Sequence, residues 1–156
     1  MLTCIFEDGG KGNLRHVVVD TLVLKGNKIL LNKRAPRLLE GGKWGLIGGY
    51  VELNETIHEA VIREAFEETG YEISNLKLLK IVDSPNRLGE DRQNISFIFF
   101  CKAGAKKGEK DDEVTELRWF DLHALPSEDT IAFDHLESIN SYKEWKRKPH
   151  PLPVVF

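Results

Sequence analysis

The sequence contains few of the residues that build zinc sites or disulfide frameworks. Its 156 residues include two cysteines, Cys4 and Cys101, with no C-x-x-C spacing, and each lies inside a short apolar run. The five histidines form no H-x-x-x-H pair. Thiol and imidazole metal sites depend on such paired spacing, so a zinc site has little support. We expect both thiols to be buried and inert.

Long apolar runs and an excess of one charge are absent as well. No stretch approaches the length of a membrane span, and the first residues, MLTCIFEDGG, lack a positively charged region followed by a long apolar one. Lys and Arg number 22 against 25 Asp and Glu, a net charge of −3. This balance gives no electrostatic footprint for nonspecific binding of nucleic acid or membranes. We therefore expect a cytoplasmic protein that binds neither stably.

The pattern of strands and helices predicts one α/β domain. No internal repeat or linker divides the chain, so a single domain is expected over residues 1–156. Two β-rich runs, Arg15–Leu24 and Lys28–Arg34, flank the turn KGN and predict a hairpin. After the loop APRLLEGGKWGLIGG we expect a helix at Thr56–Thr69, strands at LKLLKIVD, NISFIFFCK and ELRWFDL, and a helix at about Leu136–Lys146. This order predicts a mixed sheet flanked by helices.

The first of these helices carries signals at both ends. Thr56 and Glu59 form a capping box, and Gly70 is a C-terminal cap. At about 100° per residue the side chains divide into two faces. The face expected to pack on the core consists of Ile62, Ala65, Phe66 and Thr69, and the opposite face carries Glu64, Glu67 and Glu68.

The acidic face is unusual for a helix stabilised by its own charges. Its three glutamates stand at i, i+3 and i+4 with no lysine among them, so they repel one another. A solvated helix face is the simplest alternative. However, the preceding Gly-rich loop adds Glu52 and Glu55, which brings five carboxylates near one point. Mg²⁺ commonly bridges such carboxylates to substrate phosphates, whereas the D-x-D-x-D-G loop of an EF-hand calcium site is missing. The pattern predicts a divalent cation and a phosphate-containing substrate.

The stretch from Gly49 to Tyr71 resembles the Nudix box, G-x5-E-x7-R-E-U-x-E-E-x-G-U, in which U is a bulky apolar residue. The U positions hold Ala65 and Tyr71, and the Pro-Gly-Gly that often precedes the box is replaced by Ile47-Gly48-Gly49. The flanking strands, GKWGLIGG and ELRWFDLHALP extend the resemblance over most of the chain. All seven fixed positions of the box match: Gly49, Glu55, Arg63, Glu64, Glu67, Glu68 and Gly70.

This resemblance implies an α/β/α sandwich and a metal-dependent pyrophosphatase. Nudix enzymes hydrolyse a phosphoanhydride bond in nucleoside diphosphate derivatives with divalent cations, usually Mg²⁺, with Mn²⁺ as the alternative. By position in the motif, Arg63 would orient the glutamates and Glu55 would support them. The metal ligands would be Glu64, Glu67, Glu68 and the carbonyl of Gly48, with one of the glutamates also acting as a catalytic base.

Further candidates lie outside the box. Glu113 stands where many family members carry an additional metal-binding or catalytic acid, and Asp111 and Asp112 compete with it for that role. Trp44 either borders the substrate or belongs to the core. His135 has no partner that the sequence assigns. The candidate substrate-binding residues are Lys33, Arg34, Arg87 and Arg92.

Three functions remain open on the sequence alone. The leading hypothesis is hydrolysis of a substituted nucleoside diphosphate such as ADP-ribose or a nucleotide sugar, or of a nucleoside triphosphate. The second is a MutT-like triphosphatase for oxidised dGTP or other noncanonical nucleotides. The third is a noncatalytic nucleotide sensor, against which the complete set of motif glutamates argues. The sequence leaves open the choice between a monomer and a homodimer.

Overall fold

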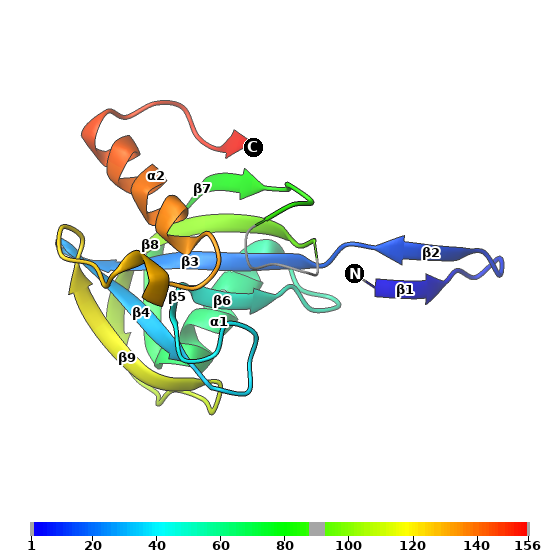
Figure 1. The fold of residues 1–156 in the computed structure, drawn as a ribbon, viewed down its shortest axis with the longest axis horizontal. Helices are drawn as coiled ribbons and strands as arrows, with labels where there is room; N and C mark the ends of the chain where they lie inside the picture. The colour runs from blue at the N-terminus through cyan, green and yellow to red at the C-terminus, as the bar shows by residue number, and fades with distance from the viewer. Residues whose placement is uncertain (1, 88–92, 156) are drawn as a thin grey trace.

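In the part of the chain that the structure describes, the β-branched and aromatic runs of the sequence form one mixed sheet of eight strands. The computed structural model describes residues 2–87 and 93–155. Helix α1 (Ile57–Thr69) covers one face of the sheet and α2 (His135–Arg147) the other (Figure 1). The α/β class, with helices on both faces of a mixed sheet, is confirmed. The strands are β3 (Val17–Lys25), β4 (Lys28–Arg34), β5 (Trp44–Gly45), β6 (Ile47–Tyr50), β7 (Tyr71–Val82), β8 (Ile95–Lys106), β9 (Val114–Asp121) and β10 (Val154–Val155).

The sheet divides between β3 and β4, and this division positions the candidate site. The two strands pair only near their connecting turn, residues 23–25 with residues 28–30. Farther from the turn, β3 pairs with β6 and with β8, while β4 pairs with β5 and β9. The predicted hairpin is confirmed, but its strands diverge. The space between them is open to side chains from both faces of the sheet.

Two apolar cores pack on the two faces. On one face, Leu22 and Leu24 of β3 belong to a buried cluster with Ile139 and Tyr142 of α2. On the other face, Val19 of β3 packs in a cluster with residues 60 and 61 of α1. Alternate residues of β3 thus face different helices, as the period of a strand requires.

The buried face of α1 differs from the predicted one. Ile62 and Phe66 are 54% and 43% exposed, so the expectation that they face the core is wrong. Ala65 and Thr69 are buried as expected. Small alanines let a helix approach a sheet more closely than large side chains do, and the face that packs is the one that carries them. The buried residues of the helix are Ala60, Val61, Ala65, Glu68 and Thr69.

Short strands and one cysteine also depart from the sequence prediction. The loop before α1 contains β5 and β6, and the proline-rich tail adds β10 beside β7. Strands β1 (Leu2–Ile5) and β2 (Lys11–Leu14) form a separate hairpin that extends from the body (Figure 1).

Because Cys4 lies in this hairpin, it is only partly buried, whereas Cys101 is buried and its burial raises the pKa of the thiol to about 12. Among the described residues, no helix is long and apolar enough to cross a membrane.

The end of α1 is joined to the loop that follows β8. Gly70 has a left-handed φ of 71°, and its N–H donates to Phe66 O at 2.7 Å. Its own carbonyl accepts hydrogen bonds from the N–H groups of Lys107 and Gly108 at 2.8 and 3.1 Å. A Cβ at Gly70 would lie 2.0 Å from Gly108 O. Glycine is therefore required here both for the backbone angle and for the contact.

We expect Gly70→Ala to destabilise the fold more than a matched glycine substitution. Gly26 has a similar φ of 62°, but no atom lies within 4 Å of the position of an added Cβ. Gly26→Ala should cost about 1 kcal/mol for the left-handed backbone. Gly70→Ala should cost about 2–4 kcal/mol, because the steric overlap adds to this strain. Urea unfolding measures both, and equal losses would contradict the role of the contact with Gly108.

Candidate active site

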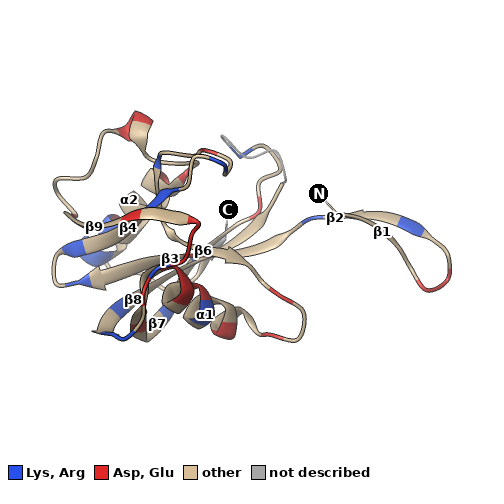
Figure 2. Ribbon diagram, turned by 90° about the horizontal axis from the view of Figure 1, so that it is seen from below, with Lys and Arg blue, Asp and Glu red and all other residues tan. Residues whose placement is uncertain are grey.

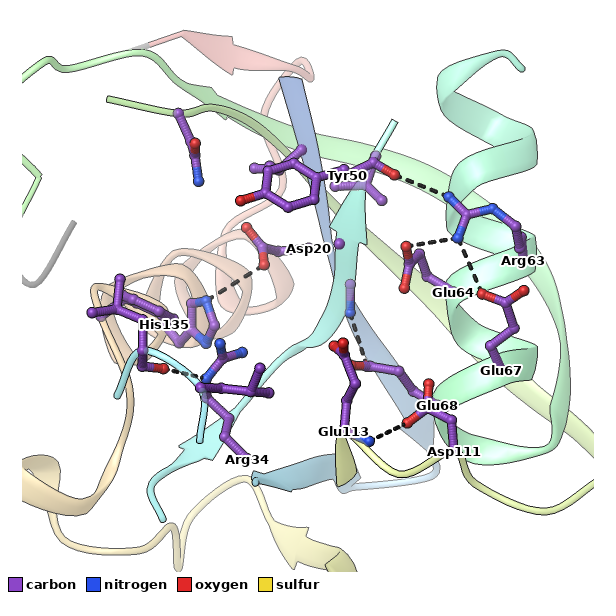
Figure 3. Close-up of a pocket in the computed structure, with 18 of the residues that line it drawn as sticks. Asp20, Arg34, Tyr50, Arg63, Glu64, Glu67, Glu68, Asp111, Glu113 and His135 are labelled. Carbon is purple, nitrogen blue, oxygen red and sulfur yellow. Dashed lines mark hydrogen bonds and ion pairs between the residues drawn. The ribbon is translucent and has the colours of Figure 1, made fainter. Parts of the chain in front are cut away.

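A cavity of about 450 Å³ opens where β3 and β4 separate. Figure 3 shows side chains from α1 on one side of it and Asp20 and His135 on the other. Figure 2 shows acidic residues on α1 and on the loop beside it. The described lining residues include three arginines, Arg34, Arg63 and Arg87. They also include eight acids: Asp20, Glu52, Glu64, Glu67, Glu68, Asp111, Asp112 and Glu113. Four of the five carboxylates that the sequence grouped thus line a single space, and Glu55 does not.

Two glycines let β6 lie close both to β3 and to the helix carboxylates. A Cβ at Gly49 would lie 2.4 Å from Glu64 Oε1, and one at Gly48 would lie 1.9 Å from Val19 O. Gly48 also donates its N–H to Glu68 Oε2 at 3.1 Å. A side chain at Gly49 would push β6 away from Glu64, and one at Gly48 would push β6 away from β3. The glycines before the helix are therefore part of the site's geometry.

Arg63 orients the glutamates through all of its donors. It donates to both oxygens of Glu55 at 3.0 and 2.7 Å, to Glu64 at 2.7 Å and to Glu67 at 3.1 Å. The fifth hydrogen bond goes to Tyr50 O at 2.9 Å. A guanidinium has five N–H donors, so its capacity is fully used. These contacts raise the pKa of Arg63, and the hydrogen bond to Glu55 contributes most. They outweigh partial burial, which acts in the opposite direction.

Glu55 supports this arrangement from outside the cavity. It is not among the residues that line the cavity, and its Oε1 also accepts the N–H of Glu52 at 2.6 Å. The hydrogen bond from Arg63, followed by that from Glu52, lowers the pKa of Glu55. Glu55 therefore stays ionised and holds Arg63 in place, which matches a supporting position rather than that of a metal ligand.

Glu68 is a buried carboxyl group without a compensating cation. It is 5% exposed, and one oxygen accepts hydrogen bonds from Asn32 Nδ2 at 3.0 Å and from the N–H of Gly48. Burial raises the pKa of Glu68 well above its usual value, and repulsion from Glu64 and Asp111 adds to this, while the two hydrogen bonds oppose it. No Lys or Arg forms an ion pair with Glu68 within the described part of the chain. An added cation would remove this electrostatic cost.

The pKa of Glu64 is raised by its surroundings as well. Burial raises the pKa of Glu64, and the hydrogen bond and charge of Arg63 oppose that increase. The nearby carboxylates of Glu67 and Glu113 raise it further. Glu67 itself is half-exposed and reaches the cavity from the next turn of the helix. The carboxylates thus repel one another across the space that they line.

These residues provide the donors for a hard divalent cation. As the side chains stand, no three His, Cys, Asp or Glu residues in ranges 2–87 and 93–155 are grouped closely enough to hold an ion. Arg63 holds Glu64 and Glu67, and Asn32 and Gly48 hold Glu68, which accounts for their separation. A bound cation would require these carboxylates to exchange some of their present hydrogen bonds for the ion. An all-oxygen donor set with a surplus of negative charge fits Mg²⁺ or Mn²⁺.

The carbonyl of Gly48 faces the same space. Gly48 lies opposite Asp20 in the β3–β6 pair, and its N–H points to Glu68 instead of to β3. In an antiparallel pair, a residue directs its N–H and C=O to the same side. Its carbonyl oxygen therefore also points away from β3, toward the glutamates. This orientation suits the additional ligand suggested by the sequence.

The loop at residues 111–113 adds acids above the cluster. Its position is fixed by hydrogen bonds from the N–H of Asp111 to Glu67 O at 3.0 Å and from the N–H of Ala35 to Glu113 O at 2.8 Å. Asp111 and Glu113 lie close enough to raise the pKa of Glu68 and of Glu64, respectively. The carboxylate of Asp112, by contrast, pairs with Arg37 at 2.9 Å. Glu113 and Asp111 are better placed for chemistry than Asp112.

The four basic candidates are placed differently. Arg34 lines the cavity, but Lys33 does not and instead lies 5.7 Å from the ring of Trp44. Successive side chains of a strand point to opposite faces of the sheet, which separates these two residues. Arg87 lines the cavity and makes a two-pronged ion pair with Asp134. Arg92 lies outside the described residues.

Sequence reasoning missed one end of the site. Asp20 was not singled out, and His135 had no assigned partner, yet both line the cavity within 3.5 Å of each other. Phe133 lies beside them and stacks 5.1 Å from Arg34. An acid inside the apolar run VVVDTLVL is a signal that could have identified Asp20. Trp44, the other aromatic candidate, is 8% exposed and packs in the core.

Comparison with known proteins gives a consistent result. Residues 14–142 match the model of the NUDIX domain. The chain is 40% identical over 131 residues to the ADP-ribose pyrophosphatase of Methanocaldococcus jannaschii, covering 83% of this chain and 74% of that protein. It is 32% identical over 108 residues to the NAD-capped RNA hydrolase NudC of Pseudomonas aeruginosa, covering 67% of this chain but only 36% of that protein. The crystal structure of a NUDIX hydrolase from Nitrosomonas europaea superposes with a TM-score of 0.78 at 24% identity, over 94% of this chain and 81% of that one.

We expect Glu68→Gln to stabilise the protein when divalent cations are removed. The pKa of Glu68 is raised in the folded state above the unfolded value of 4.5, so folding favours the protonated form. Wild type and variant should be equally stable below about pH 4.5, and the variant should become more stable by about 1 kcal/mol or more as the pH rises through the folded pKa. Chemical unfolding in EDTA between pH 4 and 8 measures this.

Added Mg²⁺ or Mn²⁺ should make the wild type more stable than Glu68→Gln at neutral pH, because the ion stabilises the wild type more than the variant. A variant that is less stable than wild type in EDTA at neutral pH would show that Glu68 serves the fold and not a cation.

Proposed function

The chain belongs to the NUDIX family and is a hydrolase of pyrophosphate bonds, and we propose that it cleaves ADP-ribose or a closely related nucleoside diphosphate derivative with Mg²⁺. Nudix hydrolases generally use divalent metals. The 40% identity to an ADP-ribose pyrophosphatase over most of both chains supports this substrate class. Mn²⁺ is the alternative ion, since it accepts the same oxygen donors.

The observation that carries the proposal is the buried carboxyl of Glu68. It lies beside Glu64 and Asp111 in a cavity with a surplus of acids, and its burial is electrostatically unfavourable without a cation. If Glu68 had no cation to bind, a neutral residue in its place would leave the fold at least as stable. The arrangement is instead suited to binding a positive ion between the protein and a negatively charged substrate.

Each residue of the cluster has a distinct task in this proposal. Glu64, Glu67 and Glu68 would hold the cation together with the Gly48 carbonyl, and Arg63 fixes the directions of Glu64 and Glu67. The ion would neutralise the phosphoryl oxygens and polarise the attacking water. Glu113 accepts the proton of that water, since its loop lies over the cluster and its carboxylate is not one of those held by Arg63.

Arginines at the other side of the cavity bind the substrate. Arg34 donates through Nε to Leu39 O at 2.9 Å, which uses one of five donors, and its guanidinium lies over Phe133. Arg34 is therefore held in place with donors left for a phosphate oxygen. Arg87 is held by Asp134 and contributes positive charge to the same wall.

Two other substrates remain as alternatives. Similarity to an NAD-capped RNA hydrolase favours an NAD-like diphosphate, although the chain spans only about a third of that relative. The MutT-like reaction on oxidised dGTP has the same metal requirement and has no observation of its own in its favour. A cytoplasmic location and a monomeric or homodimeric state remain predictions.

The decisive experiment measures product release from ADP-ribose, NAD, nucleotide sugars, nucleoside triphosphates and oxidised dGTP, with Mg²⁺, Mn²⁺ or EDTA. We expect ADP-ribose to give the highest kcat/KM and EDTA to abolish turnover. Glu64→Gln should reduce kcat by about a hundredfold or more, because it removes a proposed ligand. Glu72→Gln serves as a matched control, since Glu72 lies outside the cavity and pairs with Lys107 at the surface.

Full activity of Glu64→Gln, or turnover that is unaffected by EDTA, would refute the assignment of the carboxylate cluster. A higher kcat/KM on oxidised dGTP than on ADP-ribose would move the protein to the triphosphatase alternative. Stabilisation by ADP-ribose without turnover of any substrate would instead support the sensor hypothesis.

A further inference from the structure

The wall of the cavity opposite α1 contains an acid that the proposed metal chemistry does not use. Asp20 lies in β3, and its side chain points to the α2 side of the sheet, as do those of Leu22 and Leu24 farther along the strand. In Figure 3, Asp20 and His135 lie across the cavity from Glu64 and Glu67. The side chain of Asp20 keeps 15% of its surface exposed. A ligand in the cavity can therefore reach it.

The carboxylate of Asp20 is held by two neighbours. The hydroxyl of Ser96 donates to Oδ2, and His135 Nε2 lies 3.5 Å from Oδ1. His135 is 3% exposed, and its Nδ1 accepts the N–H of Leu46 at 2.9 Å. The proton of the ring therefore sits on Nε2, which faces Asp20. Groups from β8, α2 and the segment between β5 and β6 together fix the direction of one carboxylate.

Asp20 also stays negatively charged. An aspartate carboxylate is ordinarily ionised at neutral pH, and its two neighbours, Ser96 and His135, present an O–H and an N–H to it. A carboxylate can accept about four hydrogen bonds, and the two neighbours occupy only some of these positions. Asp20 thus offers a permanent anionic acceptor at the edge of the cavity.

A fixed negative charge restricts what can bind beside it. The proposed substrate carries a diphosphate, which the carboxylate would repel unless a cation lay between them. The part of the substrate that lies against Asp20 must therefore be uncharged and must carry O–H or N–H donors. In a substituted nucleoside diphosphate these are the ribose hydroxyls and the amino group of the base.

The position of Asp20 favours the ribose. Asp20 is the cross-strand partner of Gly48, whose N–H is bonded to Glu68 at the metal cluster. Adjacent strands are about 4.8 Å apart, so the backbone of Asp20 lies one strand from the proposed site of cleavage. The ribose is attached directly to the diphosphate, whereas the amino group of the base lies farther away.

We propose that Asp20, oriented by Ser96 and His135, binds a neutral hydrogen-bond donor of the substrate, foremost a ribose hydroxyl, and thereby determines specificity. This inference rests on the proposed function, because it assumes a nucleoside diphosphate derivative in the cavity. Asp20 is a binding residue in this account. The carboxylates of α1 and the loop at residues 111–113 carry out the hydrolysis.

The test compares wild type with Asp20→Asn on four substrates: ADP-ribose, its hypoxanthine counterpart, which lacks the amino group of the base, and two counterparts that each lack the 2′- and 3′-hydroxyls of one ribose. Loss of a hydrogen bond to a charged group should raise KM for ADP-ribose by about tenfold to a hundredfold, with a smaller change in kcat. The substrate that lacks the recognised donor should show no difference between wild type and variant.

Two further variants separate binding from folding. Thr21→Val changes the next residue of β3, which is buried and is not one of the residues that line the cavity, so KM should be unchanged. Ser96→Ala leaves the carboxylate in place but removes one of the groups that orient it, so it should raise KM less than Asp20→Asn. Unfolding transitions of all three variants check that each is folded.

The results separate failure of this inference from failure of the proposed function. An equal increase in KM on all four substrates, or a decrease in kcat alone, would overturn the role of Asp20. If the wild type hydrolyses none of them, the proposed function fails. Calorimetric binding of ADP-ribose in Ca²⁺ then tests Asp20 independently, because weaker binding by Asp20→Asn supports the contact and equal binding refutes it.

Discussion

Mutual repulsion among the carboxylates of α1 is the constraint on which the site depends. Glu64, Glu67 and Glu68 lie on consecutive turns, and burial and proximity raise the pKa of Glu64 and Glu68. Arg63 offsets part of this repulsion by using all five of its donors, four of them on Glu55, Glu64 and Glu67. The remaining negative charge at Glu68 is what a divalent cation would compensate. The fold thus maintains an electrostatic cost that ligand binding would remove.

The fold keeps these charges in place by close backbone contacts. Gly49 lets β6 approach the helix, Gly48 lets β6 approach β3, and Gly70 lets the loop after β8 approach the end of α1. Hydrogen bonds from this loop to the carbonyls of Gly70 and Glu67 carry Asp111 and Glu113 to the cluster. Since each contact leaves no space for a Cβ at Gly48, Gly49 or Gly70, the motif's glycines are requirements of geometry as much as of flexibility.

The divergence of β3 and β4 gives the cavity two chemically different ends. Glutamates of α1 enter from one face of the sheet, while Asp20 and His135 belong to the face that α2 covers. A diphosphate with a bound cation suits the first end, and an uncharged group with hydrogen-bond donors suits the second. A substrate that contains both parts would span the opening between the strands, which is consistent with a substituted nucleoside diphosphate.

The sequence by itself determined the ends of α1, the β3–β4 hairpin, the α/β class and the acidic motif, because capping residues, turn residues and fixed spacings act locally. It did not determine which face of α1 is buried, since Ile62 and Phe66 are apolar and yet exposed while Glu68 is buried. That outcome depends on how closely the helix packs on the sheet. Only the tertiary structure joined Asp20 to His135, 115 residues later in the chain, placed Arg34 inside the cavity and left Lys33 outside it. Such contacts arise from the pairing of strands and the packing of segments distant in the sequence, which no local pattern of residues encodes.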